Sequence, residues 1–394
     1  MTKLDRRSFI ASATALGATL AWAGPASPQS RSKWTERRDL YPDGVASGDP
    51  DSNSVILWTR RPFESGEKHM LITEIALDPG FTRLVSTTKV PVLAASDWTC
   101  RVLAAGLEPA TIYWYRFTDE SGAGSRIGRT ITAPGDADPR SVSFAFVSCQ
   151  SVNEGAQNAY RRMIFEDERK PVDQRLGFVL HLGDFIYEVV EYPEEVAHRY
   201  GRTVYDIGKV PNARKVRNFH VPTDVSGYRA VYQAHIRDPD IQDARAHFPF
   251  VCIGDNHEFS WKGWQSTIKY DGDPEPAQEL RVAANQAWWE YIPSRVRKAS
   301  GPGLASFDGP RVETVPITKF DADGLSDEPN SLAAIGSMTA YRALRYGRNV
   351  ELIITDLPQL HHGRSYFAAG SGLPRPSGFP ELLPGGDHGD PRRR

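Results

Sequence analysis

Residues that are able to bind a metal ion follow four apolar stretches of the sequence. The stretches are residues 142–147, 178–182, 248–253 and 350–354. The residues that follow them are, in chain order, Cys149, then Asp184 and Tyr187, then Asp255, Asn256 and His257, and finally Asp356. In open α/β sheets, ligands bind beyond the carboxyl ends of the strands. If the four stretches are strands of one such sheet, these side chains converge at one of its edges.

The residue types are those of a centre that holds two cations. A carboxylate has two oxygens and can bridge such a pair, and Asp184 is the candidate for that position. Two cations about 3.5–4 Å apart neutralise a phosphate ester, activate a water and stabilise the leaving oxygen. Tyr187 follows closely enough for its phenol to reach the same ion. Phenolate and thiolate suit Fe(III), whereas carboxylate and carbonyl oxygens suit a harder divalent ion. A plain turn after a strand is the alternative.

The histidine and the remaining acids leave several interpretations open. His257 can donate to a phosphoryl oxygen or protonate the leaving group, but a helix cap followed by a core histidine has the same local pattern. Asp255 fits either as a ligand or as an acid that supports one. Asp356 fits better as a structural acid, and we do not assign His361 and His362 to the metal site.

Several tryptophans and cysteines carry less information. The tryptophans nearest the third stretch and in the helical stretch after it are Trp261, Trp264, Trp288 and Trp289. We expect them to pack on the sheet rather than to line a substrate cleft. The three cysteines do not make a disulfide framework, and we expect Cys100 and Cys252 in the core.

The elements that must position these groups fall into two parts. Residues 38–134 contain short β-branched and aromatic runs separated by Gly, Pro, Asp and Ser. This pattern predicts a small N-terminal β-sandwich of the immunoglobulin or fibronectin type. After a linker at 134–139, apolar strands alternate with charged helical stretches such as 157–166 and 278–291. Strands apolar on both faces and separated by helices predict an α/β domain over 141–394.

Length and net charge argue against a nucleic-acid-binding protein, and the N-terminal residues resemble an export signal. The 394 residues suffice for two domains, and a net charge of −2 leaves no basic footprint for nucleic acid. Arg6 and Arg7 precede a mild apolar run, and residues 21–23 have the small-x-small form of a cleavage site. Residues 1–30 therefore resemble a twin-arginine signal peptide and leader, read by the Tat machinery, which implies a periplasmic or secreted protein. An ordinary secretory signal with incidental arginines is the alternative.

Taken together, the motifs resemble a known family. Gly183-Asp184 followed by Asn256-His257-Glu258 is similar to the calcineurin-like metallophosphoesterase signature, and the spacing of Asp184 and Tyr187 is similar to the iron–phenolate motif of purple acid phosphatases. The whole layout resembles the PhoD alkaline phosphatase family. The matching stretches are residues 44–50, 54–60, 144–150, 181–188 and 341–342. The resemblance implies a centre of Fe(III) and Ca(II) with a cysteine ligand, which would be Cys149, and hydrolysis of phosphate monoesters and diesters.

The sequence departs from the family pattern at three places. Asp255 and Asn256 stand where the family has two acidic residues before its His-Glu pair, although the carbonyl oxygen of Asn256 can still bind an ion. Residues 356–361 lack the arginines of the family's Asp-Thr-Arg-Gln-Tyr-Arg stretch. The family's later Gly-Asp-x-His motif has only a poor counterpart at 386–391, because no apolar strand precedes it. We therefore expect an incomplete catalytic domain, either cut short or shifted in frame near its end, that is weakly active or inactive.

The resulting hypothesis is an exported, metal-dependent phosphatase or phosphodiesterase of the alkaline phosphatase D type that uses a metal-bound hydroxide. Its metal ligands would be Cys149, Asp184, Tyr187, Asp255 and Asn256, and its catalytic residue would be His257. We expect small phosphate mono- or diester substrates and a monomer. The alternatives are a phospholipase D-like phosphodiesterase and an inactive binding module left by truncation.

Overall fold

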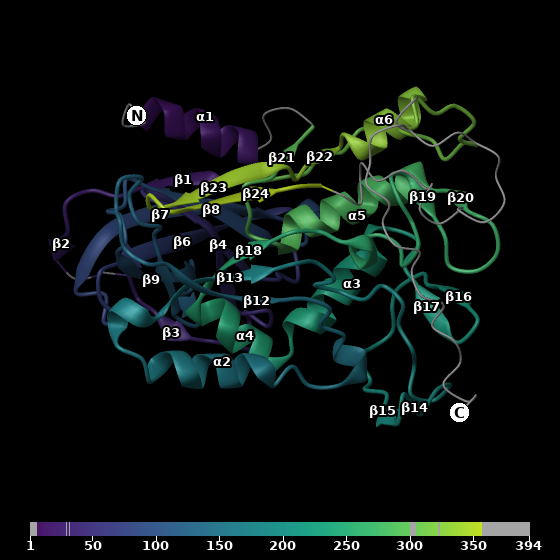
Figure 1. Cartoon of the computed structure of the whole chain (residues 1–394). Coiled ribbons are helices and arrows are strands. Elements are labelled where there is room, and N and C mark those ends of the chain that lie inside the picture. Colours follow the sequence, from purple (N-terminus) through teal and green to yellow (C-terminus); the bar gives the residue numbers. More distant parts are fainter. Residues whose placement is uncertain (1–5, 29, 31, 300–304, 322–323, 357–394) are drawn as a thin grey trace.

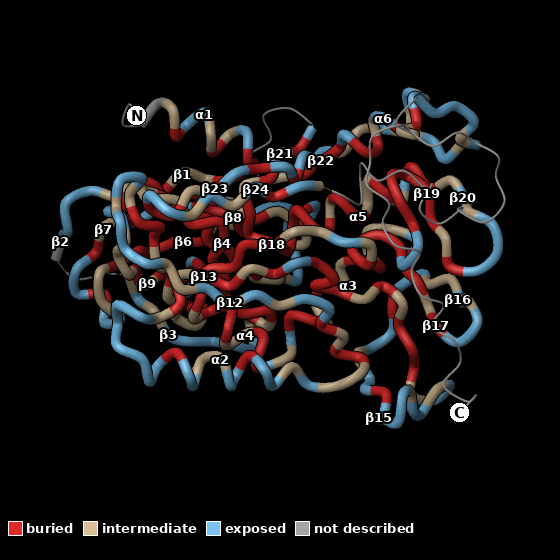
Figure 2. Tube along the Cα trace, viewed as in Figure 1, coloured by how far each residue is buried: buried red, intermediate tan, exposed pale blue. Residues whose placement is uncertain are grey.

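The computed structural model describes residues 6–28, 30, 32–299, 305–321 and 324–356. Over these residues the chain forms two seven-stranded sheets, several two-stranded hairpins and six α-helices. Figure 1 shows the sheets together in one half of the molecule, with most helices and short hairpins beside and below them. Buried positions concentrate along the central strands, as Figure 2 shows, whereas the outer helix faces and the hairpin tips are exposed.

The first sheet is mixed and joins strands from both predicted domains. Its strands, in order of pairing, are β1 (Thr19–Trp22), β8 (Thr99–Ala105), β5 (Ser54–Arg60), β4 (Val45–Asp51), β18 (Pro249–Cys252), β13 (Leu176–His181) and β12 (Ser143–Val147). β18, β13 and β12 are parallel neighbours, whereas β4, β5 and β8 pair antiparallel. The two groups meet where β4 pairs with β18, with Gly48 opposite Phe250. Gly48 is required there, because a Cβ at this position would lie 1.8 Å from the Pro293 carbonyl oxygen.

The second sheet packs on the N-terminal part of the first. Its strands are β2 (Ser27–Pro28), β7 (Arg83–Leu93), β6 (Lys68–Ala76), β9 (Ile112–Asp119), β10 (Ala123–Gly124) and β3 (Thr35–Glu36), and β11 (Gly128–Ile131) pairs with β9. A buried cluster fills the space between the sheets, with Leu57 and Val102 from the first and Ile75, Val90 and Phe117 from the second. Alternate strand residues enter this cluster, as the two-residue period of a β-strand requires. The β-rich N-terminal part predicted from the sequence is therefore present as two packed sheets.

Helices cover one face of the parallel strands, and a hairpin (residues 342–354) covers the other. The covering helices are α2 (Ala159–Glu168), α3 (Val225–Ile236), α4 (Pro239–His247) and α5 (Gln278–Tyr291), and α6 (Pro329–Ile335) packs against α5. Apolar residues of α2 to α5 share one core with Val179, Phe250 and Cys252 of the strands. On the opposite face, Phe178 and Val251 pack against the hairpin. The helices predicted over 157–166 and 278–291 are confirmed as α2 and α5.

The fourth predicted strand does not belong to the parallel sheet. β24 (Val350–Ile354) pairs antiparallel with β23 (Arg342–Tyr346), and this hairpin lies on the face opposite the helices. The prediction that Asp356 ends a fourth strand of the same sheet is therefore wrong. An apolar run predicts a strand, but it does not say which strand supplies the hydrogen-bonding partners, and in β24 the side chain of Ile353 is exposed.

Residues near the N-terminus fold onto the outer face of the first sheet. α1 (Arg6–Leu16) leads into β1, which runs parallel to β8 at the edge of the sheet (Figure 1). Phe9 and Leu16 pack there against Ile56 and Leu103 in a small buried cluster. No helix in the described part of the chain has the length and apolarity needed to cross a membrane. The export signal predicted over 1–30 stays a prediction.

The remaining elements are short. The hairpins are β14 (His198–Arg199) with β15 (Arg202–Thr203), β16 (Arg214–Val216) with β17 (Phe219–Val221), and β19 (Thr267–Ile268) with β20 (Glu275–Pro276). β21 (Arg297–Lys298) and β22 (Met338–Thr339) form a two-stranded sheet between segments that α6 separates. The 3-10 helices are η1 (Ala94–Ser96), η2 (Val152–Glu154), η3 (Val172–Gln174) and η4 (Asn256–Glu258). Figure 1 shows β14 to β17, β19 and β20 together at one end of the molecule, on the side of α3 and α5.

Candidate active site

The ends of β12, β13 and β18 bring the predicted site residues to one edge of the first sheet. The three strands are parallel neighbours, so the chain leaves all of them on the same side. Cys149 and Asp184 both have positive φ, at 58° and 53°, and the Cys149 N–H donates to the Gly183 carbonyl at 3.2 Å. Gly183 has a φ of 102° and no room for a side chain, since a Cβ would lie 2.5 Å from the Asp255 Cβ. These features draw the loops after the three strands into contact.

A sulfur and a phenol converge on one carboxylate oxygen. The Sγ of Cys149 lies 3.4 Å from Oδ2 of Asp184, and the Oη of Tyr187 lies 3.5 Å from the same atom. The other oxygen, Oδ1, accepts the backbone N–H of His257 at 3.3 Å. Burial first, and then the charge of Asp184, raises the pKa of Tyr187 well above its usual value. Asp184 is therefore the shared centre of three loops, the position expected of a carboxylate that binds ions through both oxygens.

Asn256 and Asp255 follow β18 at the same edge. The amide nitrogen of Asn256 donates to the Trp261 carbonyl, so the amide oxygen is the atom that can bind an ion. Asp255 caps η4 by accepting the N–H of Asn256 at 2.9 Å. Partial burial, followed by the nearby charge of Asp184, raises the pKa of Asp255 above its usual value. The cap interpretation is therefore confirmed for Asp255, and the ligand interpretation stays a prediction for both residues.

His257 is oriented by a buried glutamate that the sequence analysis did not single out. The Nδ1 of His257 lies 2.6 Å from Oε2 of Glu188, and the other oxygen of Glu188 accepts the Trp261 N–H at 2.5 Å. The imidazole stacks on the Tyr187 ring, with 4.1 Å between centroids. Burial lowers the pKa of His257, but Glu188 and then the nearby acids more than offset this, so the pKa lies above its usual value. With Nδ1 engaged, Nε2 is the nitrogen left to exchange a proton with a substrate.

A second buried glutamate ties the loops to one another. Glu258 accepts the backbone N–H groups of Asp184, Phe185 and Asp255 at 3.1, 2.5 and 2.6 Å. Burial, followed by the charge of Asp184, raises the pKa of Glu258 to about 8. These bonds hold the loop after β13 against the loop after β18. The sequence contained a signal for this residue, because a glutamate directly after the candidate histidine stood in the motif.

Tyr187 is held in place by a histidine on α3. The Nε2 of His235 accepts the Tyr187 N–H at 3.1 Å, and its Nδ1 donates to the Val231 carbonyl at 2.9 Å. Burial lowers the pKa of His235 to about 4, so the ring is neutral, as an acceptor nitrogen requires. Neither spacing nor composition could have indicated this contact, because it joins two segments that are distant in sequence.

The donor atoms fit part of a two-ion centre. Within the described ranges, no group of three or more His, Cys, Asp or Glu side chains is arranged to hold a metal ion. The cluster at Asp184 differs from such a group because its third donor is the Tyr187 phenol. Thiol, carboxylate and phenol together are the anionic donors that suit Fe(III), and the amide oxygen of Asn256 suits a harder divalent ion.

The other residues considered in the sequence analysis are mostly buried in the core, and two of them, Trp261 and Asp356, lie next to the candidate site. Cys100, Cys252, Trp264, Trp288 and Trp289 are buried core residues, as expected. Trp261 is the exception, because 37% of it is exposed and it lies next to His257. Asp356 accepts the Ala340 N–H at 3.4 Å, as a structural acid would, and lines a small cavity with Asp255 and Glu258. His361, His362 and residues 386–391 lie outside the described part of the chain.

Two of the stretches that resemble the family, residues 44–50 and 341–342, are joined by a buried ion pair between Asp49 and Arg342. Nε and Nη2 of Arg342 lie 2.6 and 3.0 Å from the two carboxylate oxygens of Asp49. Nη2 also donates to the Cys252 carbonyl at 2.6 Å, at the end of β18. The pair therefore fastens β4 and β23 to the strand that carries the site, and does not itself belong to the site.

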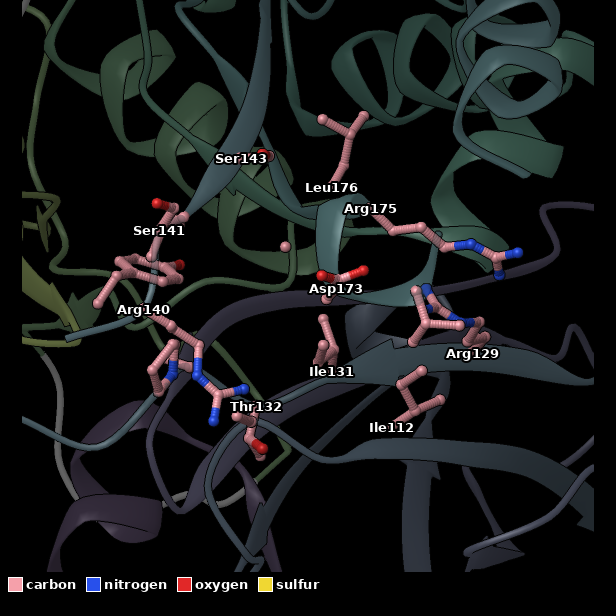
Figure 3. A pocket seen from close by; sticks show the side chains of 17 residues that line it. Ile112, Arg129, Ile131, Thr132, Arg140, Ser141, Ser143, Asp173, Arg175 and Leu176 are labelled. Carbon is pink, nitrogen blue, oxygen red and sulfur yellow. The ribbon is translucent and has the colours of Figure 1, made fainter. Parts of the chain in front are cut away.

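A large cavity lies at the other end of the parallel strands. It has a volume of about 410 Å³ and is bordered by Ser143 and Leu176, which begin β12 and β13. In Figure 3, Arg129 and Arg175 lie on one side of it and Arg140 on the other. Because the candidate donors lie beyond the opposite ends of these strands, this cavity is separate from the candidate active site.

Comparisons with known proteins agree with this layout. The chain matches the PhoD-like phosphatase family over residues 144–371, and the N-terminal domain of PhoD-like phosphatases over residues 26–134. It is similar to alkaline phosphatase D of Bacillus subtilis (strain 168), with 34% identity over 272 residues, which are 66% of this chain and 42% of the relative. It is also similar to a solved structure of PhoD, with a TM-score of 0.60 and 26% identity, over 84% of this chain and 54% of the other. The chain thus spans about half the length of these relatives. Since the first match alone covers more than half of its residues, the chain belongs to the PhoD-like phosphatase family.

Proposed function

We propose that this chain hydrolyses phosphate esters at the carboxyl ends of β12, β13 and β18. The observation that carries the proposal is the convergence of Cys149 and Tyr187 on one oxygen of Asp184, beside a histidine oriented by Glu188. Such a site offers anionic ligands for cations together with a proton donor, which are the two requirements of metal-assisted ester hydrolysis. Membership of the PhoD-like phosphatase family supports phosphate esters as the substrate class.

The donor set supports Fe(III) and Ca(II) as the ions. Cys149, Asp184 and Tyr187 would hold the iron, and Asp184 with Asn256 and Asp255 would hold the calcium. When bound, the ions would offset the charge of the phosphate and make a water nucleophilic.

The protein's own groups then have defined tasks. In the reaction, a water oxygen bonds to phosphorus, the bond from phosphorus to the ester oxygen breaks, and the attacking water releases a proton to solvent. His257 donates a proton from Nε2 to the departing oxygen and recovers one from solvent. Glu188 keeps Nδ1 engaged, so that Nε2 is presented to the substrate. The Tyr187 ring stacks on the imidazole and restricts its rotation.

Substitution of Asp184 tests the proposal. With iron and calcium supplied, the wild-type chain should hydrolyse p-nitrophenyl phosphate and bis(p-nitrophenyl) phosphate. Asp184→Asn should lower kcat by more than about 100-fold, because even the loss of a partner that only supports a ligand costs about 10–100-fold. Asp243→Asn is the control, since this half-exposed carboxylate pairs with Arg126 away from the site. No turnover by the wild type, or full turnover by a folded Asp184→Asn, refutes the proposal.

The same assay separates the alternative functions. A phospholipase D-like enzyme would cleave a phosphatidylcholine vesicle faster than the small diester. An inactive binding module would bind inorganic phosphate without turnover of either ester. Both outcomes are distinct from hydrolysis of small esters.

We also propose the finer organisation that the sequence suggests. Residues 1–30 would be a twin-arginine signal read by the Tat machinery, 38–134 an immunoglobulin-like sandwich, and 141–394 a metallophosphatase domain of a periplasmic or secreted monomer. In the folded chain Ala21 is buried in β1, so cleavage after Ala23 requires β1 to separate from β8. N-terminal sequencing of the exported protein tests this, and a mature chain that begins at Met1 contradicts it.

A further inference from the structure

Trp261 differs from the other tryptophans near the site. It is 37% exposed, whereas Trp264, Trp288 and Trp289 are 6%, 3% and 1% exposed. An exposed tryptophan on its own needs no explanation, because much of a protein surface is apolar. The position of this one is unusual because of how its backbone and ring are held.

Both backbone polar groups of Trp261 are bound by residues of the candidate site. Its N–H donates to Oε1 of Glu188 at 2.5 Å, while the other oxygen of Glu188 holds His257. Its carbonyl accepts the amide nitrogen of Asn256, which leaves the Asn256 oxygen for an ion. The Trp261 backbone is therefore fixed relative to both His257 and the Asn256 loop.

The indole also continues a row of aromatic rings that begins at the donor cluster. Tyr187 stacks on His257 at 4.1 Å, and the His257 ring is nearly parallel to the Trp261 ring, at 6.2 Å and 20°. Phe219 meets Trp261 edge-on at 6.0 Å and supports it from the β16–β17 hairpin. The ammonium of Lys262 lies over the Trp261 ring, 4.9 Å from its centroid, so a stacking leaving group would have to displace this mobile side chain or share the ring with it. Trp261 is thus the partly exposed member of a set of three neighbouring rings that also includes His257 and Tyr187.

We propose that Trp261 is the leaving-group platform of this enzyme and selects phosphate esters with a flat, unsaturated leaving group, such as a phenol or a nucleoside. This inference rests on the proposed function, because it takes His257 as the donor to the departing oxygen. In this proposal the departing oxygen lies within reach of Nε2 and the rest of the leaving group lies against the neighbouring indole, whose ring is 6.2 Å from the imidazole. A flat π-system stacks on an indole, whereas a polyol such as glycerol gains little from that surface.

The test compares two esters in matched variants. The protein, loaded with iron and calcium, is assayed on phenyl phosphate and on glycerol 1-phosphate, and the ratio of the two kcat/KM values is the selectivity. Because each ratio uses the same two esters, their intrinsic reactivities cancel between variants. Trp261→Ala should lower the selectivity for phenyl phosphate about tenfold, the scale of one stacking contact. Trp261→Phe should keep most of the selectivity, and Trp261→Leu, which is apolar but not flat, should lose it.

Phe165→Ala is the control variant. Phe165 is a half-exposed aromatic residue on α2, with the Arg169 guanidinium 5.1 Å from its ring, so it matches Trp261 in exposure and in its neighbouring cation. Its removal should leave the selectivity unchanged. An equal fall for both esters in Trp261→Ala would overturn the inference, because it would mean that Trp261 only positions His257 and Asn256. Unchanged selectivity would overturn it as well.

A binding measurement separates this inference from the proposed function. Phenylphosphonate and methylphosphonate cannot be hydrolysed as esters, and their affinities are measured by titration calorimetry on the same loaded protein. We expect a preference of about tenfold for phenylphosphonate that Trp261→Ala removes. If the wild type turns over neither ester but keeps this preference, the function fails and the platform stands. If it turns over both esters without any preference that depends on Trp261, the platform fails and the function stands.

Discussion

Replacing Glu188 by glutamine probes the step that the structure defines best. Glu188 and His257 are both buried, and Nδ1 lies 2.6 Å from Oε2, a short hydrogen bond to a charged group. Hydrogen bonds to charged groups contribute about 1.5–3 kcal/mol, and more is lost when the remaining partner stays buried without one. Glutamine has nearly the same shape and still accepts the Trp261 N–H, so the fold should survive. The loss should therefore appear in the orientation and charge of the imidazole.

We expect Glu188→Gln to lower kcat roughly 10- to 100-fold. This is the change in rate when a hydrogen-bond free energy of about 1.5–3 kcal/mol is lost from the transition state. KM should stay within about threefold, because Glu188 does not face the substrate. The assay is steady-state hydrolysis of p-nitrophenyl phosphate with iron and calcium supplied.

A second His–Glu pair in the same chain provides the control. Nε2 of His220 lies 3.2 Å from Oε2 of the exposed Glu195, on the surface. Glu195→Gln should leave kcat unchanged, since a surface pair contributes little. If Glu188→Gln and Glu195→Gln behave alike, or if Glu188→Gln changes KM alone, the orienting role of Glu188 is wrong.

Three further substitutions follow from the geometry. Tyr187→Phe should abolish the visible charge-transfer band of protein purified with iron, because a phenolate ligand is its source; a band that persists would exclude Tyr187 as a ligand. Gly183→Ala should lower the free energy of unfolding in urea more than Gly201→Ala does. At Gly201 an alanine only has to adopt a positive φ, which costs roughly 1–2 kcal/mol. At Gly183 the new Cβ would in addition lie 2.5 Å from the Asp255 Cβ. Equal costs would contradict the crowding argument. Arg342→Met should lower the free energy of unfolding by about 3–5 kcal/mol, because Asp49 stays buried without its charged partner. The control Arg162→Met breaks an exposed ion pair on α2 and should cost under about 0.5 kcal/mol. Similar costs for the two variants in urea melts would show that the buried pair has no special role.

Local sequence was sufficient for the residues that stand directly after a strand. Cys149, Asp184, Asn256 and His257 each follow an apolar run closely, and the parallel order of β12, β13 and β18 brings them together. The helices over 157–166 and 278–291 were predictable for a similar reason, since polar and apolar residues repeat at helical spacing over short distances. Such patterns predicted where the strands lie but not how far each is covered, because Phe146 of β12 is 70% exposed and Ile353 of β24 is 65% exposed.

Only the tertiary structure decided which distant groups meet. Glu188, Glu258 and His235 position the predicted residues through hydrogen bonds that span 48 to 74 positions of sequence. The sequence predicted β24 as a fourth strand of the sheet, but β24 pairs with β23 in a hairpin that lies across one face of the sheet. An apolar run can be a strand within a sheet or a strand packed on its face, and the run itself does not distinguish the two. The four tryptophans also separated only in the folded chain: three entered the core, whereas Trp261, whose backbone is bound by Asn256 and Glu188, is partly exposed. The sequence by itself thus determined the chemistry available at each strand end, and the packing of segments far apart in the chain determined the partners that orient it.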